Sequence, residues 1–388
     1  MSPSPFYIYF KKIMTVNVLN FLLRCNGIPP VFANSQVPCI KYMFYILRKV
    51  CVCFANSYLI YRIMKIFQHD NITFDVFPLI NAAVTAFTVN SIALQYQKFK
   101  EFSVKIQHQL EKYNIVLSGG SLIKLGVFYF IFMSYFFVCG LIFPSNASHF
   151  FDCASNSTDS EDVLHIPGLI TFTHAAIFII CGSSVVVSIM LYCFVCILLQ
   201  QVLHSIYNDL KSLQSEHEIE PKCIHQFRTR FLEAANLVHV SDNVLSFFGL
   251  VGLGCVFSRA CACIHFYLNL VKTPEVTWWF IVTQIFFDVS ALTAVCCFSA
   301  SVSEETRRIS PMVLLINNKI PPKNVSFHLQ CLNFSKIILT QEVHMTAWKL
   351  FPFTRRVLPT VIGVTLSYIT VIIQMNHATT MKQVTQRF

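Results

Sequence analysis

Long segments without a single Asp, Glu, Lys or Arg constrain this chain more than any other feature. A helix needs about 20 mostly apolar residues to cross a bilayer, and four charge-free segments are long enough: 76–97, 125–151, 163–208 and 357–381. Only 12% of all residues are charged, against about 25% in ordinary soluble proteins. We therefore expect an all-α membrane protein, and the composition excludes a plain cytosolic enzyme and a disordered chain.

Three further segments complete a prediction of seven transmembrane helices. Segment 243–271 is interrupted only by Arg259, and segment 276–303 only by Asp288. The segment near 42–64 is the weakest, because Lys49 and Arg62 shorten its charge-free part. Basic residues near the ends of a helix can still extend their charged groups to the membrane surface.

The distribution of Lys and Arg predicts a cytoplasmic N-terminus and an extracellular C-terminus. Six basic residues lie between position 1 and Lys49, before the charge-free part of the first predicted helix, and segments 98–124 and 304–356 are also rich in Lys and Arg, whereas 152–162 holds only acidic charges. Glycosylation sequons on the predicted outer face make three asparagines expected acceptors: Asn71, Asn146 and Asn156. This orientation is the reverse of that of a G-protein-coupled receptor.

The inner segments are predicted to contain helices of their own. Apolar residues recur at helical spacing between 224 and 238, and 163–208 is too long for one crossing of a bilayer core about 30 Å thick. With 325–350, these pieces either form a cytoplasmic bundle or lie as separate helices at the membrane surface. We therefore divide the chain into four parts. Residues 1–41 are a cytoplasmic segment, and residues 42–303 hold the first six membrane helices, with inner-loop helices at about 200–240. Residues 304–356 are a cytoplasmic anchor region, and residues 357–388 are the seventh helix with a short extracellular tail.

Neither the cysteines nor any motif points to an enzyme, a metal or a cofactor. Nucleotide-binding, zinc-protease and serine-hydrolase motifs are absent, and the histidines are not at metal-ligand spacing. Most of the 16 cysteines fall in predicted membrane helices or on the reducing side, where a packing role is expected. A bridge between Cys139 and Cys153 near the outer face stays open. The basic excess follows from the inner loops and not from nucleic-acid binding.

The last predicted helix has a stripe of polar and small residues. Spacings of three and four residues place the stripe on one side of the helix: Thr360, Gly363, Ser367, Thr370, Gln374 and His377. Polar groups that face lipid are energetically unfavourable. The stripe therefore either packs closely against another helix or lines a pore built from several copies, and spacing alone leaves both interpretations open.

Arg259 and Asp288 are predicted to lie at similar depth in neighbouring helices and to form an intramembrane ion pair. The pair is either structural or part of a ligand cavity. Gln284 lies one helical turn from Asp288 on the same face, Trp278 lies near the outer interface, and His174 lies in the outer half of its helix. Gln284, Asp288, His174 and Trp278 are thus the candidate ligand-binding residues.

Two short motifs resemble the insect gustatory receptor family. They are Met345-Thr346-Ala347-Trp348-Lys349-Leu350-Phe351-Pro352-Phe353 and Ser367-Tyr368 followed by five residues and Gln374-Met375. The family has Thr-Tyr, five apolar residues and Gln-Phe in its seventh helix. Here Ser367 and Met375 replace the Thr and the Phe, and Thr370 interrupts the apolar run. Ser303-Glu304-Glu305 and residues 26–30 resemble the family more weakly.

The resemblance implies a ligand-gated, non-selective cation channel in the plasma membrane of sensory neurons. It implies a homotetramer or a hetero-oligomer with related receptors, a small-molecule tastant, and passage of monovalent and divalent cations along the seventh helices. Gln374 and Met375 would lie at the gate, with Tyr368 in support. Alternatives are an odorant receptor subunit that needs a co-receptor, a transporter or metabotropic receptor, and a non-conducting protein of the same fold. The sequence identifies neither the tastant nor the ion selectivity.

Overall fold

The computed structural model describes residues 96–113, 167–215, 221–269, 275–319, 324–341 and 343–385. It also describes single positions or short runs at 18, 52–64, 79–94, 120–134 and 321. The side chains of 167–185, of most residues between 251 and 285, and of 375–385 lie outside this description. The predicted count of seven membrane helices and the orientation of the termini stay predictions, because much of the first three predicted helices lies outside the described residues.

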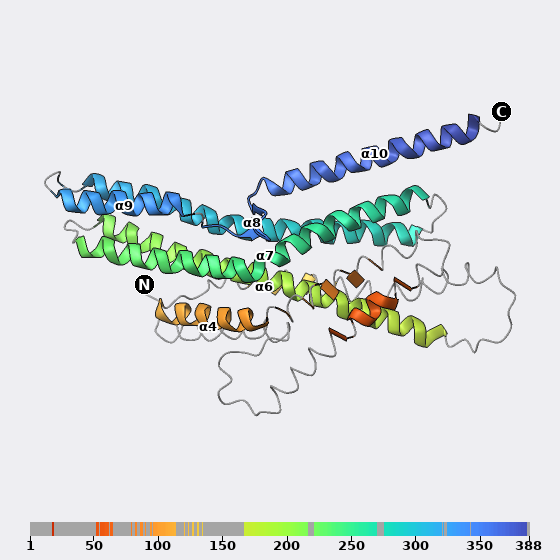
Figure 1. Ribbon diagram of the computed structural model, residues 1–388, viewed down its shortest axis with the longest axis horizontal. Helices are drawn as coiled ribbons and strands as arrows, with labels where there is room; N and C mark the ends of the chain where they lie inside the picture. Colours follow the sequence, from red (N-terminus) through yellow and green to blue (C-terminus); the bar gives the residue numbers. More distant parts are fainter. Residues whose placement is uncertain are drawn as a thin grey trace, which may run out of the picture.

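Three long helices dominate the structure: α6 (Pro167–Ser215), α7 (Pro221–Asn269) and α8 (Glu275–Lys319) (Figure 1). At 1.5 Å per residue, helices of 49, 49 and 45 residues are each roughly 70 Å long. That is more than twice the apolar thickness of a bilayer. The prediction that the helix in 163–208 extends beyond one membrane crossing is therefore confirmed.

The inner-loop helices predicted at about 200–240 are not separate elements. Residues 200–215 are the end of α6, and residues 221–240 are the first half of α7. The boundary placed between 303 and 304 falls inside α8, which continues across it without a break. Among the described residues, two helical stretches are long and apolar enough to cross a bilayer, Val186–Ser215 and Phe286–Lys319.

The core is centred on α6. Residues 190–196 of α6 are at most 2% exposed, so this part of the helix is covered on every side, as its uniformly apolar sequence predicts. Helices α7 and α8 both pack against it. Helix α4 (Tyr96–Lys112) packs against α7 and buries an apolar face made of Phe99, Phe102, Ile106 and Leu110.

Helix α9 (Val325–Thr340) packs against α8 and α7. It buries Phe327, Cys331, Phe334, Ser335 and Ile338, which favours a helical bundle over separate surface helices. The expected helical segment 325–350 is helical only as far as Thr340. Beyond it, β1 (Thr346–Ala347) and β2 (Phe351–Pro352) form an antiparallel hairpin in which Thr346 pairs with Pro352 and Ala347 with Phe351. Pro352 has no N–H to donate within a helix, which agrees with a hairpin at this position.

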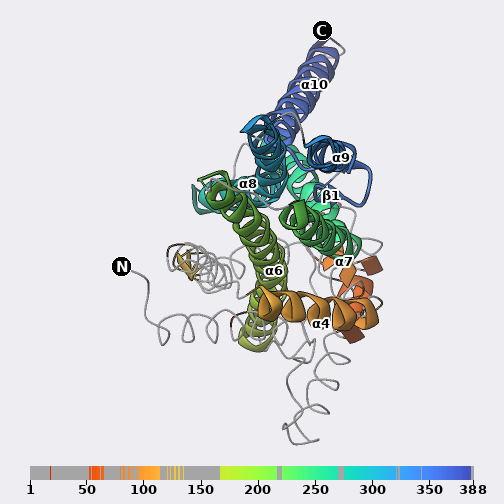
Figure 2. The same ribbon diagram turned by 90° about the vertical axis from the view of Figure 1, so that its left-hand side faces the viewer.

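Helix α10 (Val357–Thr385) follows the hairpin and confirms the helix predicted at 357–381. It contacts α7 and α8, then extends away from the other helices (Figures 1 and 2). The first two predicted membrane segments also meet, because the side-chain amides of Asn56 and Asn90 exchange hydrogen bonds of 3.1 and 2.9 Å.

Candidate functional site

The polar stripe of α10 faces away from its own chain. On an ideal helix with 100° per residue, the half-buried residues of α10 cluster on one side: Val357, Leu358, Val361 and Thr365. The first three of these pack against the core. The described stripe residues lie on the opposite side, and all of them are exposed: Thr360, Gly363, Ser367, Thr370 and Gln374. Within one chain, the stripe is therefore not a helix–helix seam.

The surroundings of α10 agree with this placement. A methyl group added at Gly363 would meet no atom within 4 Å. Tyr368 lies toward the half-buried side, and its ring packs against Phe257 of α7 with centroids 5.8 Å apart. The supporting position expected for Tyr368 thus has a partner in α7. Gln374 is exposed, while the side chain of Met375 lies outside the described residues, so the proposed gate itself stays a prediction.

The hydroxyls of the stripe are satisfied within the helix. Thr360 Oγ1 donates to the carbonyl of Arg356 at 2.8 Å, Ser367 Oγ to that of Gly363 at 2.9 Å, and Thr370 Oγ1 to that of Leu366 at 3.0 Å. Such bonds to the residue four positions earlier are common for Ser and Thr in membrane helices.

The hairpin at the base of α10 is fixed to one face of α7. Asp242 is 3% exposed, and its Oδ1 accepts the backbone N–H of Thr346 at 2.6 Å. Thr346 Oγ1 lies 2.9 and 2.8 Å from the two carboxylate oxygens and donates to them. One turn further along α7, the carbonyl of Ser246 accepts the N–H of Trp348 at 2.9 Å.

Phe353 packs at the same junction between the hairpin and α7. Its side chain is fully buried and lies directly over Gly249 of α7, where a Cβ atom would come within 2.3 Å of Cε2 of the ring. The same ring makes edge contacts with Tyr192 of α6 and with Phe351, both at centroid distances of 6.2 Å. The base of α10 is thus joined to both α7 and α6.

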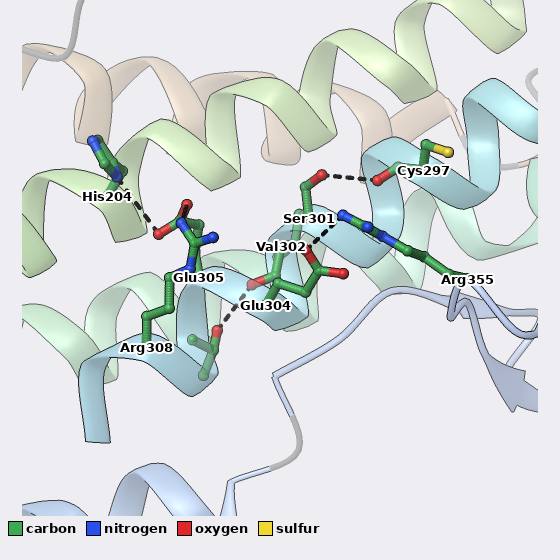
Figure 3. A network of polar contacts seen from close by, with 9 residues as sticks. His204, Cys297, Ser301, Val302, Glu304, Glu305, Arg308 and Arg355 are labelled. Carbon is green, nitrogen blue, oxygen red and sulfur yellow. Dashed lines mark hydrogen bonds and ion pairs between the residues drawn. The ribbon is translucent and has the colours of Figure 1, made fainter. Parts of the chain in front are cut away.

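A second polar network joins α8 to its neighbours (Figure 3). Glu304 of α8 accepts a hydrogen bond from Arg355, just before α10, at 2.8 Å. The next residue, Glu305, is buried, and its carboxylate oxygens lie 3.5 Å from Nδ1 of His204 on α6 and 3.0 Å from Nη1 of Arg308. The Glu-Glu pair noted in the sequence therefore ties α8 to α6 and to the start of α10.

A third cluster joins the end of α4 to α7. Lys112 Nζ donates to both carboxylate oxygens of Glu233, at 2.8 and 2.7 Å, and the hydroxyl of Tyr113 donates to the same carboxylate. Partial burial alone would raise the pKa of Glu233, but the hydrogen bonds from Lys112 and Tyr113 lower it below its usual range. The hydrogen bond from Lys112 to Glu233 raises the pKa of Lys112. The pKa of Tyr113 is raised mainly by burial of its ring and also by its own hydrogen bond to Glu233. Arg230 lies over the Tyr113 ring at 4.9 Å.

The candidate ligand-binding residues lie on helices that pack together. His174 is on α6, Trp278, Gln284 and Asp288 are on α8, and α6 contacts α8. Asp288 is 5% exposed. The side chains of Arg259, His174, Trp278 and Gln284 lie outside the described residues, so both the Arg259–Asp288 pair and the ligand site stay predictions.

Several other expected sites fall where the structure describes nothing. Asn71, Asn146 and Asn156, and the cysteines Cys139 and Cys153, all lie outside the described residues. Cys193, Cys196 and Cys331 are free and buried, as a packing role predicts. In the part of the chain that is described, no three His, Cys, Asp or Glu residues are placed to hold a metal ion.

Sequence reasoning missed the Asp242 contact. Asp242 stands at the edge of the charge-free segment 243–271, and its partner Thr346 is 104 positions away, so no local pattern joins the two. The one available signal was the motif 345–353 itself, which contains Pro352 and therefore does not fit the helical segment expected there.

The fold is that of a known insect receptor. The olfactory receptor OR5 from Machilis hrabei superposes with a TM-score of 0.68 at 13% identity, covering 95% of this chain and 99% of that chain. The same receptor in complex with eugenol gives a TM-score of 0.72 at 12% identity with the same coverage. At this identity the similarity establishes the fold alone.

The sequence gives the family. Residues 14–377 match the 7tm chemosensory receptor family, so the chain belongs to this family of multi-pass membrane receptors, which is not an enzyme family. The resemblance found in the short motifs is thereby confirmed at the level of the chemosensory receptor superfamily. No curated protein matches the sequence.

Proposed function

We propose that this chain is a gustatory receptor that acts as a ligand-gated, non-selective cation channel for small-molecule tastants. It would lie in the plasma membrane of sensory neurons, with its N-terminus inside and glycans at Asn71, Asn146 and Asn156. The observation that carries the proposal is the direction of the α10 stripe. Its polar residues face away from the chain's own helices, and polar groups in a membrane need water or another protein surface. A central pore of several α10 helices supplies both.

A second exposed stripe supports assembly from identical subunits. Four apolar residues of α9 lie on the side opposite its buried face and are 72, 58, 52 and 73% exposed: Val325, Leu329, Leu332 and Leu339. Their spacing of four, three and seven residues is typical of a seam between two helices. Joining such seams in a homotetramer buries this apolar surface and brings the four α10 helices to a common axis.

The proposed mechanism is a shift in population. A ligand enters from outside and binds between α6 and α8, near His174, Trp278, Gln284 and Asp288. It prefers a state in which the α10 helices move apart, so binding increases the fraction of open pores. The pore carries no Asp, Glu, Lys or Arg between 357 and 381, which accounts for weak selectivity among monovalent and divalent cations.

The first experiment is whole-cell recording from cells that express this chain alone, during application of sucrose, fructose, caffeine and quinine. We expect inward cation currents with at least one compound, and Gln374→Ala to alter gating or permeation without lowering the amount of protein at the cell surface. Thr365→Ala is the matched control, because Thr365 lies nine residues earlier and on the opposite side of α10. Equal currents from wild-type protein and Gln374→Ala would remove Gln374 from the gate.

The fold similarity to an olfactory receptor favours one second candidate, an odorant receptor subunit that conducts only with a co-receptor. The same recordings separate the two candidates. Current from the chain alone supports the gustatory receptor. If the chain is silent alone and conducts only with a co-receptor, with eugenol included among the odorants applied, it is the odorant receptor subunit.

A further inference from the structure

We infer that a hairpin latch, formed by Asp242 and Ser246 of α7 with Thr346 and Trp348 of the hairpin, couples α7 to the pore helix α10. These are positioning residues, because they act on α10 and touch neither ligand nor ion. The inference rests on the proposed channel function and deepens it by naming where movement of α7, which packs against the proposed ligand-binding helices α6 and α8, reaches the pore.

The hairpin is a rigid connector. Trp348 and Lys349 have φ angles of 45° and 61°, in the left-handed region that residues other than glycine rarely adopt. The turn is closed by the N–H of Leu350, which donates to the carbonyl of Ala347 at 2.9 Å, and the N–H of Phe353 donates to the carbonyl of Met345 at 2.9 Å. Backbone in this region persists only where its surroundings hold it, and here the surroundings are α7.

Asp242 has the strongest contacts in the junction. Its buried carboxylate accepts hydrogen bonds from the N–H and the hydroxyl of Thr346. Nζ of Lys349 lies 3.8 Å from Oδ2 of the same carboxylate. The Thr346 hydroxyl also accepts the N–H of Lys349 at 3.1 Å, so one threonine ties the carboxylate to the turn. Hydrogen bonds to a charged group are stronger than neutral ones, and removing one partner leaves the other buried without compensation.

Successive turns of one α7 face hold the hairpin. Asp242 binds Thr346, Ser246 binds Trp348, and Gly249 lies under Phe353. The spacing of four and three residues keeps these positions on one face of the helix. A displacement of α7 therefore carries the hairpin with it, and α10 begins at Val357, four positions after Phe353.

A second polar link to the base of α10 is weaker. Glu304 and Arg355 have side chains that are 39 and 68% exposed, and exposed ion pairs contribute little to stability. This contrast supplies a matched control. Removing the Asp242 contact should uncouple α10 from α7, whereas removing the Glu304 contact should leave the coupling in place.

The test compares four variants by agonist-evoked current, divided by the number of surface subunits measured by biotinylation. The probe is whichever of sucrose, fructose, caffeine and quinine activates the wild-type chain. Asp242→Asn and Thr346→Val should lower the maximal current per subunit at least about tenfold. Thr346→Ser, which keeps the hydroxyl, and Glu304→Gln, which removes only the exposed link, should both match the wild type.

A second measurement needs no current and follows the latch itself. Ala347 in strand β1 of the hairpin is fully buried, so a cysteine introduced by Ala347→Cys should react slowly with a maleimide in inside-out vesicles. Adding Asp242→Asn should accelerate modification of the peptide containing position 347 at least about tenfold, and adding Glu304→Gln should not. Mass spectrometry separates this peptide from those with native cysteines.

The outcomes distinguish the latch from the channel. Full evoked current in both Asp242→Asn and Thr346→Val, from an active wild-type channel, overturns the coupling and leaves the proposed function intact. Unchanged maleimide reactivity in Asp242→Asn shows that Asp242 does not hold the hairpin and also overturns it. A chain that stays silent with every probe and every co-receptor overturns the proposed function and the coupling together.

Discussion

The contact between Gly249 and Phe353 gives a sharp test of the junction at the base of α10. In Gly249→Ala, the new Cβ would lie 2.3 Å from Cε2 and 2.6 Å from Cζ of the Phe353 ring. An ordinary carbon–carbon contact is about 3.5 Å, so the ring has to retreat by roughly 1.2 Å. The ring is fully buried and packs against Tyr192 and Phe351, which leaves it little room to move.

Two opposing effects set the size of the change. Overpacking of this kind destabilises a protein by about 1–3 kcal/mol, while alanine is favoured over glycine inside a helix by about 1 kcal/mol. For Gly249→Ala we expect a net loss of about 1 kcal/mol in the free energy of unfolding. In a Phe353→Leu background both clashing atoms are absent, and the same substitution should instead stabilise by up to about 1 kcal/mol.

The predicted result is a change of sign between the two backgrounds. Thermal unfolding of purified protein in lipid nanodiscs measures it, because each comparison is made within one background and removes the effect of Phe353→Leu itself. Gly254→Ala is the control on the same helix, since a Cβ at Gly254 meets no atom within 4 Å, and it should raise stability in both backgrounds. If Gly249→Ala stabilises the wild-type chain as Gly254→Ala does, the Phe353 ring does not restrict position 249.

Two further predictions concern the regions around this junction. Because the pKa of Glu233 is lowered in the folded protein, its contribution to stability is present above the usual carboxyl pKa of about 4.3 and is lost as pH falls through the lowered value. Glu233→Gln should therefore remove this part of the acid sensitivity of unfolding. A pH profile of unfolding identical to that of the wild type would contradict this prediction. The double substitution Leu329→Glu with Leu332→Glu should convert the assembly to smaller species in light scattering, because it places charges in the exposed α9 stripe. The control Ser326→Glu lies off this stripe and should leave the assembly unchanged. A tetramer that stays intact in the double variant would place the subunit interface elsewhere.

The helices of the described part were largely predictable because lipid-crossing segments are defined by composition. The last helix was expected at 357–381 and is found at Val357–Thr385, and the extension of α6 followed from length alone. The continuity of α7 was not predictable in this way. Arg228, Arg230 and Glu233 interrupt its first half, so hydropathy separates one 49-residue helix into an inner helix and a membrane segment.

The candidate site, too, was predictable only where it depends on local sequence periodicity. Periodicity gave the side of α10 on which its polar residues lie, since that depends only on 100° per residue. It did not give what lies opposite, because the neighbours of α10 come from α7 and α8, far away in sequence. The Asp242–Thr346 contact was out of reach for the same reason. A single buried carboxylate at the edge of an apolar segment has no periodic signal, and its meaning appears only when its partner is in place.

The structure also changes which residue of the stripe bears most on the proposed pore. The hydroxyls of Thr360, Ser367 and Thr370 donate to carbonyls of their own helix, so their exposure to lipid would be tolerable. Gln374 differs, because in the described part of the structure its side-chain amide has no such bond to the helix. An amide transferred to an apolar medium without partners loses about 2–7 kcal/mol. The case for water or a second subunit along this side of α10 therefore rests on Gln374 far more than on the hydroxyls, and its substitution is the decisive one among the residues of the stripe.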